Sequence, residues 1–98
     1  MDEKEIVEIL MRSDGVRIER ITSKGHVSPE GFWYDQDENE WVALLKGNAV
    51  LGFDDGSEIK LSAGDTLYIP AGRRHRIIDT SVDPECVWFC VFTDKGVK

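Results

Sequence analysis

The chain is organised around one stretch, Gly64-Asp65-Thr66-Leu67-Tyr68-Ile69-Pro70-Ala71-Gly72-Arg73-Arg74-His75. Gly64 supplies the backbone freedom of a tight turn, and residues 66–69 alternate in the manner of a β-strand. Pro70 ends that strand because it has no amide hydrogen for a sheet hydrogen bond. Gly72 lets the backbone swing round, so that His75 begins the next strand. The spacing therefore predicts two strands joined by a corner that holds one imidazole in a fixed place.

Length and composition indicate one globular domain covering residues 1–98. A chain of 98 residues has the usual size of a single core, and 41% hydrophobic residues is ordinary for a globular protein. The formal net charge of −7 argues against a nucleic-acid partner, because phosphate binding needs clustered Lys and Arg. Only Arg73-Arg74-His75-Arg76 concentrates such residues. This run reads either as a solvated loop or as a contact for an anionic small molecule.

The sequence predicts a cytoplasmic protein with no membrane partner. No stretch approaches the roughly 18 apolar residues of a membrane span, and the acidic N-terminus lacks a signal-peptide core. Cys86 and Cys90 lie in one predicted strand, which places their Cα atoms about 13 Å apart. A disulfide needs Cα atoms within about 7 Å, so both residues are expected to be buried free thiols in a reducing compartment.

Residues 1–15 are expected to form a short helical segment. Ile6, Ile9 and Leu10 fall on one helical face of Asp2–Arg12, and Ser13-Asp14-Gly15 supplies a stop signal. We expect this helix to pack on the exterior of a barrel or to exchange onto a neighbouring subunit. A frayed tail is the alternative.

Residues 16–93 are expected to form an antiparallel β-sandwich or barrel. The predicted strands are 16–21, 32–36, 40–46, 49–53, 58–61, 66–69, the strand that begins at His75, and 86–92, with turn signals between them. The first reads as an edge strand with its charges on the outer side, and Gly47-Asn48 reads as a tight hairpin.

Two of the predicted strands, 40–46 and 86–92, are apolar on both faces. If the Glu40 face lines a barrel, Trp41 points outward on the opposite face. An apolar outer face must be covered, either by the N-terminal segment or by another subunit. The pattern therefore predicts a homodimer.

These residues resemble the two motifs of the cupin family. The second motif spaces Gly, Pro, Gly and His as this chain spaces Gly64, Pro70, Gly72 and His75, with Asp79 where an Asn is usual. Glu40 and Gly47 keep the spacing of the first motif, but Tyr34-Asp35-Gln36 stands where the family has His-x-His. The resemblance spans residues 31–92, and the closest likeness is to small single-domain cupins with a Phe-Trp-Tyr-Asp-Gln stretch before the Glu. It implies an all-β, jelly-roll-like barrel, to which the N-terminal helix is added.

In cupins the two motifs converge on one divalent metal, so the resemblance implies Glu40 and His75 as metal ligands. Gln36 and Tyr34 stand in the two histidine positions, and Gln36 is expected to be a third, weak ligand through its carbonyl oxygen. One imidazole in place of three implies a weak, oxygen-rich site that favours zinc, manganese or nickel over iron. The metal would act as a Lewis acid on a polar metabolite, with Tyr34 or Glu40 handling a proton. Dioxygenase chemistry is disfavoured unless His26 reaches the site.

Two further functions remain open, and the sequence leaves catalytic activity undecided. A metal-free module would hold a small carboxylate or sugar in a cavity lined by Tyr34, Gln36, Val42, Leu44, Tyr68 and His75. A dimeric stress or regulatory protein would use the faces around Trp41 and Trp88 for self-association. Simpler roles are also open: His75 could bond within its loop, and Glu40 could pair with Arg74 or Arg76.

Overall fold

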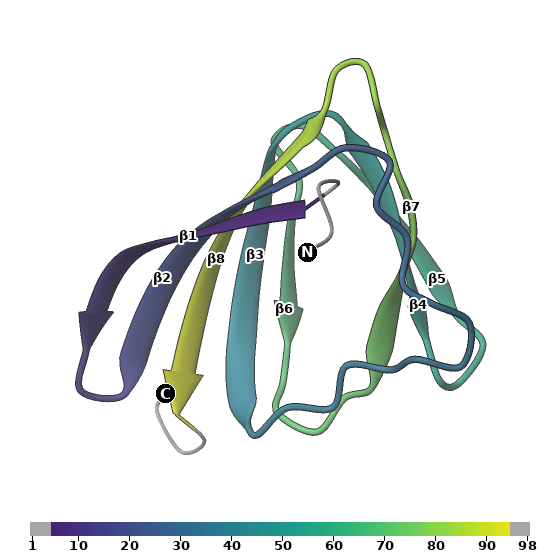
Figure 1. The fold of residues 1–98 in the computed structure, drawn as a ribbon. Helices are drawn as coiled ribbons and strands as arrows, with labels where there is room; N and C mark the ends of the chain where they lie inside the picture. The colour runs from purple at the N-terminus through teal and green to yellow at the C-terminus, as the bar shows by residue number, and fades with distance from the viewer. Residues whose placement is uncertain (1–4, 95–98) are drawn as a thin grey trace.

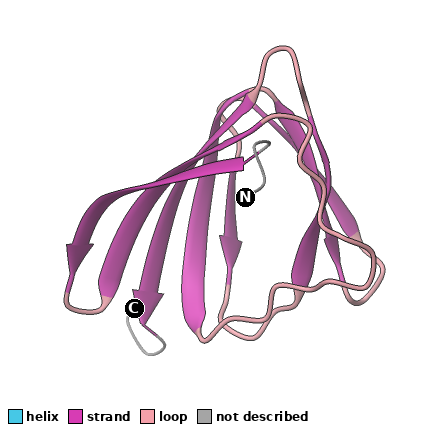
Figure 2. Ribbon diagram, viewed as in Figure 1, coloured by secondary structure: helices cyan, strands magenta, loops and turns pink. Residues whose placement is uncertain are grey.

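The computed structural model describes residues 5–94, which form eight β-strands. The strands are β1 (Glu5–Ser13), β2 (Val16–Ser23), β3 (Glu38–Lys46), β4 (Asn48–Phe53), β5 (Glu58–Ser62), β6 (Thr66–Ile69), β7 (His75–Thr80) and β8 (Cys86–Asp94). All pairings between these strands are antiparallel, and the described residues contain no helix (Figures 1 and 2). The predicted all-β antiparallel architecture is confirmed. No helix in this part of the chain is long and apolar enough to cross a membrane.

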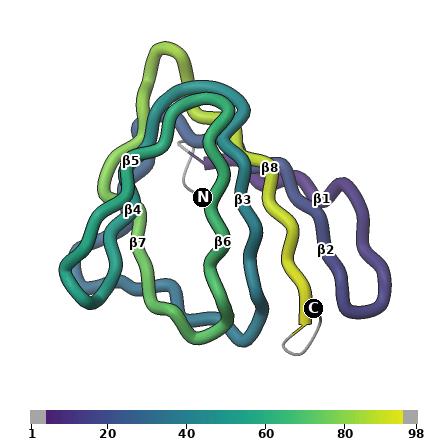
Figure 3. The backbone as a smooth tube through the Cα atoms, turned by 180° about the vertical axis from the view of Figure 1, so that it is seen from behind, coloured from purple at the N-terminus to yellow at the C-terminus, as the bar shows by residue number. Residues whose placement is uncertain are grey.

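The strands form two sheets that face each other across the core. The five-stranded sheet has the order β1-β2-β8-β3-β6, and the three-stranded sheet has the order β5-β4-β7. Seen from behind, β4, β5 and β7 lie on one side of the molecule, and β8, β2 and β1 lie on the other (Figure 3). Along β8 every second residue from Cys86 to Phe92 is buried between the sheets. This period of two is what a strand with one face on the core requires.

The N-terminal helix is a wrong prediction. Residues 5–13 form β1, which pairs with β2 across a turn in which Gly15 has φ +73°. The apolar residues at positions 6, 7, 9, 10 and 11 fit a helix and a strand alike, and the partner strand β2 decides between them. Because β1 lies outside β2, the sheet edge is β1 and not β2 as predicted. Residues 2–4 of the predicted helix lie outside the described residues.

Gly47 does not make the predicted hairpin, because β3 and β4 belong to different sheets. The chain crosses from one sheet to the other at this residue, which has φ +86°. A Cβ atom at Gly47 would lie 2.6 Å from Ser81 Oγ and 2.8 Å from the Glu85 carbonyl oxygen. The position therefore requires glycine for conformation and for space. Residues 54–56 form a turn that joins the paired strands β4 and β5.

Residues 32–36 form no extended strand. Tyr34 makes a single isolated bridge with His75, in which each backbone N–H donates to the other residue's carbonyl at 2.7 and 3.1 Å. A further hydrogen bond runs from the Gly72 amide to the Gln36 carbonyl at 2.9 Å. These bonds pin the segment against the corner before β7, so the Tyr34 and Gln36 side chains are held in place without a full ladder.

The predicted alternation of β3 is confirmed. Glu40 and Val42 are buried toward the opposite sheet, whereas Trp41 faces outward and is 40% exposed. Residues 5–13 do not cover Trp41, because β1 is separated from β3 by β2 and β8 in the same sheet. For these residues the N-terminal alternative is wrong, and within residues 5–94 the outer face remains open.

Trp88 has the opposite orientation to Trp41. It is 4% exposed, and its indole Nε1–H donates to Ser23 Oγ at 3.2 Å inside the core. It therefore offers no face for self-association, which corrects that part of the dimer hypothesis. Cys86 and Cys90 are buried free thiols, as predicted.

Candidate functional site

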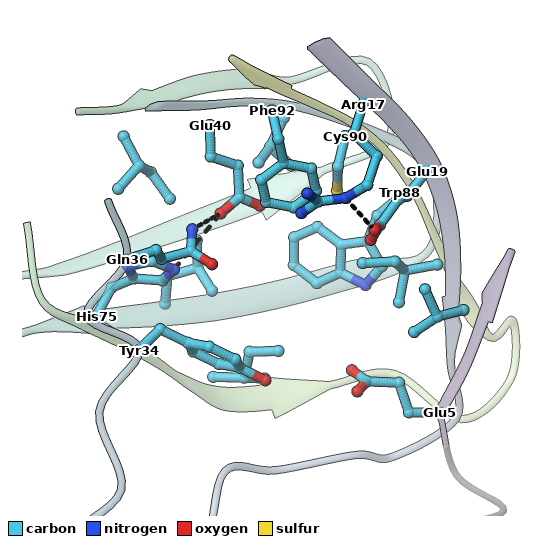
Figure 4. A pocket seen from close by; sticks show the side chains of 16 residues that line it. Glu5, Arg17, Glu19, Tyr34, Gln36, Glu40, His75, Trp88, Cys90 and Phe92 are labelled. Carbon is cyan, nitrogen blue, oxygen red and sulfur yellow. Dashed lines mark hydrogen bonds and ion pairs between the residues drawn. The ribbon is translucent and has the colours of Figure 1, made fainter. Parts of the chain in front are cut away.

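A cavity of about 220 Å³ lies between the two sheets. Much of its wall is apolar, and a set of polar side chains converges on it: Glu5, Arg17, Glu19, Tyr34, Gln36, Glu40 and His75 (Figure 4). Ligand sites in proteins usually measure about 300–1,000 Å³, so the occupant of this cavity must be a small molecule.

Glu40 lies near the start of β3, with its carboxyl buried in the cavity wall. Gln36 donates its Nε2–H to Glu40 Oε1 at 3.0 Å, and the Cys90 thiol also hydrogen bonds to the carboxyl. Burial raises the pKa of Glu40 to about 7, although these hydrogen bonds lower it in part. Near neutral pH this carboxyl therefore exchanges between its protonated and ionised forms.

His75 is the first residue of β7, and its ring faces Glu40. Its Nδ1 lies 3.0 Å from the Arg73 carbonyl oxygen, which can only accept, so Nδ1 carries the proton. Nε2 is then the unprotonated nitrogen, and it lies 3.7 Å from Glu40 Oε1, which is longer than a hydrogen bond. Burial lowers the pKa of His75, so the ring is neutral at pH 7.

Tyr34 covers the imidazole of His75. The two rings are stacked, with centroids 5.3 Å apart and planes inclined by 23°. Burial raises the pKa of Tyr34 to about 12, and the charges of Glu5 and Glu40 contribute in the same direction. The phenol therefore stays protonated at neutral pH, and Figure 4 shows its hydroxyl directed toward Glu5.

Arg17 and Glu19 of β2 line the cavity, although the sequence predicts the charges of this strand on its outer side. Arg17 Nε donates to Glu19 at 2.6 Å, and its Nη1 and Nη2 donate to the two oxygens of Glu38 at 2.9 and 3.0 Å. The hydrogen bond with Glu38 raises the pKa of Arg17 further, so the guanidinium stays charged. Its carbon lies 4.3 Å from the centroid of Phe92. The alternation of Arg17 and Glu19 with apolar residues was visible in the sequence, but it did not show which face points inward.

The structure brings five of the predicted site residues together on the cavity: Tyr34, Gln36, Glu40, Val42 and His75. It places the other two elsewhere. Leu44 is 0% exposed and packs in the core without lining the cavity, and Tyr68 is 54% exposed on the outer face.

The charged residues near the motifs also lie differently from the predictions. His26 is not a lining residue, and its Nε2 lies 3.6 Å from Glu5 Oε2. Arg76 donates to the Ser28 carbonyl at 2.9 Å, and Arg74 lies over the ring of Trp33. Neither arginine pairs with Glu40 as one alternative expected.

Comparison with known proteins decides the family. The model of the Cupin domain matches residues 21–92, which is most of the chain. The chain belongs to the cupin family. A proposed mannose-6-phosphate isomerase from Ralstonia eutropha JMP134 has a crystal structure that matches this cupin with a TM-score of 0.89 and 38% identity, over 94% of this chain and 86% of that one.

More distant structures share the fold of this cupin. A cupin superfamily protein from Desulfitobacterium hafniense matches with a TM-score of 0.75 and 22% identity, over 97% of this chain and 81% of that one. KdgF from Halomonas sp. matches with a TM-score of 0.77 and 16% identity, over 96% of this chain and 83% of that one. A search of curated proteins gives no significant match.

The donor set of this cupin does not fit the divalent metal that its family implies. Residues 5–94 contain no group of three His, Cys, Asp or Glu side chains arranged to hold an ion. Glu40 and His75 face each other, but Gln36 turns its amide nitrogen toward Glu40, and a nitrogen that carries hydrogens is not a ligand. Tyr34 stays protonated, and its hydroxyl is directed toward Glu5. Two donors remain where a site needs at least three.

Proposed function

We propose that this cupin binds a small polar metabolite in the cavity between its sheets, without a metal. The observation that carries the proposal is the convergence of Tyr34, Gln36, Glu40 and His75 on one cavity of about 220 Å³. Nε2 of His75 lines this cavity, and its 3.7 Å separation from Glu40 Oε1 is too long for a hydrogen bond between the two. A bound polar molecule would supply a hydrogen-bond partner.

Catalysis on the bound molecule is the second candidate function, and it rests on the pair formed by Glu40 and His75. A carboxyl with a pKa of about 7 can take up or release a proton at neutral pH. A neutral imidazole opposite it can accept a hydrogen bond from the same molecule. Glu40 would be the acid–base group, and the protonated hydroxyl of Tyr34 would be a hydrogen-bond donor.

The substrate named for the Ralstonia eutropha neighbour is a phosphorylated sugar. We do not carry it over to this chain. A phosphate in the cavity would meet the carboxylates of Glu5, Glu19 and Glu40, and the Arg17 guanidinium already binds two carboxylates. The charge of the cavity favours a neutral or cationic ligand.

The proposal is tested with a panel of sugars, small acids and small amines. Chelator-treated protein is melted with each compound, and a true ligand raises the melting temperature. Glu40→Gln and His75→Ala are expected to reduce that shift. Asp79→Asn is the control, because Asp79 is exposed and does not line the cavity. A silent panel, or a shift that both cavity variants retain, would contradict ligand binding at this site.

We further propose that the protein is a homodimer formed through the outer face of its five-stranded sheet. Directly paired residues on this face form one apolar row across all five strands: Met11, Ile18, Val91, Trp41 and Tyr68. Side chains directly opposite each other on adjacent strands lie on the same face. Met11, Trp41 and Tyr68 are each exposed by 40% or more in the single chain.

The occupant that suits this face is a second copy of the chain. The five strands have 9, 8, 9, 9 and 4 residues. With a rise of about 3.3 Å per residue and a spacing of about 4.8 Å, they present roughly 600 Å². Two such faces bury roughly 1,200 Å², which is the lower end of the size of a standard stable interface. The adjacent row carries one charged pair, Glu8 with Arg20, whose charges cancel on the chain itself. Lys46, opposite Val87 on the same face, adds one positive charge, so the face does not share the chain's charge of −7 and two copies can approach through it.

A further inference from the structure

Hydrogen-bond acceptors dominate the polar surface of the cavity. His75 is 5% exposed. Its Nδ1–H donates a hydrogen bond to the Arg73 carbonyl, so the Nε2 atom that lines the cavity has a free lone pair. Gln36 donates an amide hydrogen to Glu40, so the side-chain carbonyl oxygen of Gln36 remains as an acceptor. A ligand that satisfies these groups must bring hydrogen-bond donors of its own.

Three acidic side chains from three strands line the same space. Glu5 of β1, Glu19 of β2 and Glu40 of β3 all line the cavity. The pKa of the Cys90 thiol responds to all three side chains. Burial raises this pKa, and the charges of Glu40, Glu19 and Glu5 raise it further. A carboxylate is an acceptor with a negative charge, so these residues also favour a donor that is positive.

The single cationic side chain among the described lining residues is not available to a ligand. Arg17 donates from Nε to Glu19 and from both terminal nitrogens to Glu38. Its guanidinium also lies against the ring of Phe92. An anionic ligand would have to break these charge-assisted bonds before it found a cation.

The remaining walls suit the body of a small organic cation. Tyr34, Trp88 and Phe92 contribute aromatic surface, and aliphatic side chains fill much of the rest. Aromatic rings attract ammonium groups through their negative faces, and aliphatic walls accept a short hydrocarbon chain.

We infer that the natural ligand of this cavity is a small amine cation, whose ammonium group donates to the carboxylates and to Nε2 of His75. An ammonium has three donors and no acceptor, which complements a cavity of acceptors. The inference rests on the proposed function, since it specifies the chemical class of the small molecule that the cavity binds.

The test uses three probes of similar size that differ in their head group: butylamine, butan-1-ol and butyrate. Each is titrated into the purified full chain at neutral pH, and binding is followed through the backbone amide and Trp88 indole resonances in two-dimensional NMR spectra. Butylamine is expected to bind about tenfold more tightly than butan-1-ol, because charge-assisted hydrogen bonds are roughly twice as strong as neutral ones. Butyrate is expected not to bind.

A matched pair of variants locates the effect. Glu5→Gln removes a charge from the cavity and is expected to weaken butylamine several-fold. Glu8→Gln removes the same charge from the same strand but on the outer face, where Glu8 pairs with Arg20, and is expected to leave binding unchanged. Equal weakening by both variants would mean that net charge alone attracts the amine, and this would overturn the inference.

The other outcomes separate the inference from the proposed function. The amine assignment is overturned if butyrate binds as tightly as butylamine, or if a neutral sugar binds while butylamine does not. Either result still supports ligand binding in the cavity. Failure of all three probes together with a silent melting panel overturns both.

Discussion

Nε2 of His75 and Oε1 of Glu40 face each other across 3.7 Å in the cavity, a gap too long for a hydrogen bond between them. The imidazole is held by its bond to the Arg73 carbonyl, and the carboxyl by the amide of Gln36. Hydrogen bonds with other residues therefore hold each group in place, and no hydrogen bond joins the two groups to each other. A donor group on a ligand can bond to both.

The raised pKa of Glu40 predicts a specific pH dependence of stability. In the unfolded chain the carboxyl has its ordinary value of 4.5, and in the folded chain about 7. The folded state holds the proton more tightly, so the stability from this group is complete below pH 4.5 and is lost as the pH rises through 7. The loss is on the order of 3 kcal/mol. Urea unfolding at pH 5 and pH 8 should show it.

Glu40→Gln isolates this contribution, because glutamine has no charge to bury. His75 has the opposite effect. Because its pKa is lowered in the folded state, its contribution to the free energy of unfolding decreases as the pH falls below about 6.5. The difference between wild type and Glu40→Gln therefore carries the Glu40 contribution alone. Between pH 5 and pH 8 the free energy of unfolding of the variant should rise relative to that of the wild type. The same pH dependence in the two proteins would refute the burial of this carboxyl.

Gly47→Ala should destabilise the protein by about 2–4 kcal/mol, because it combines a left-handed backbone with overpacking. The new Cβ would meet Ser81 and the Glu85 backbone within 3 Å. Gly64→Ala is the matched control: its φ is +94°, but no atom lies within 4 Å of the added carbon. Gly64→Ala should lower the free energy of unfolding by only about 1–2 kcal/mol. Equal losses in urea unfolding would mean that the crossing at Gly47 is not tightly packed.

Trp41→Lys should convert the proposed dimer to a monomer, since it places a charge in the apolar row between Val91 and Tyr68. Loss of an aromatic side chain that anchors an interface typically costs about 2 kcal/mol or more, so the dissociation constant should rise on the order of 30-fold. Val82→Lys is the control, because Val82 is an exposed apolar residue in the loop before β8, outside the five-stranded sheet. Sedimentation velocity distinguishes the species. A wild-type protein that is monomeric at micromolar concentration would rule out the interface.

The two thiols should be inert in the folded protein. Cys90 is buried and its pKa is raised by burial and by nearby carboxylates, so the reactive thiolate is scarce. Cys86 is buried too, and its Sγ lies 2.8 Å from the Asn48 carbonyl oxygen. A thiol-specific chromogenic reagent should label neither residue at pH 8 and both in urea. Rapid labelling of the native protein would show that the cavity wall opens.

Much of the fold follows from local features of the sequence. Gly64, Pro70 and Gly72 dictate turns and strand ends through their own backbone chemistry, so β6 and the start of β7 were predicted close to their observed positions. The alternation of β3 likewise placed Glu40 inside and Trp41 outside. These predictions depend on a residue and its near neighbours.

Features set by distant partners could not be predicted. The apolar residues of β1 fit either periodicity, and only pairing with β2 makes them a strand. The alternation of Arg17 and Glu19 was readable, but their inward face follows from the position of β2 beside β8. The cavity therefore holds charges from a strand that the motifs do not mention, and these charges change the expected ligand.

The central claim is that the cavity binds its ligand without a metal. The most direct measurement is calorimetric titration of the strongest ligand from the panel, before and after the protein is stripped with a chelator. We predict the same dissociation constant in both states and the loss of binding in Glu40→Gln. Binding that disappears on chelation and returns with zinc, manganese or nickel would contradict the claim.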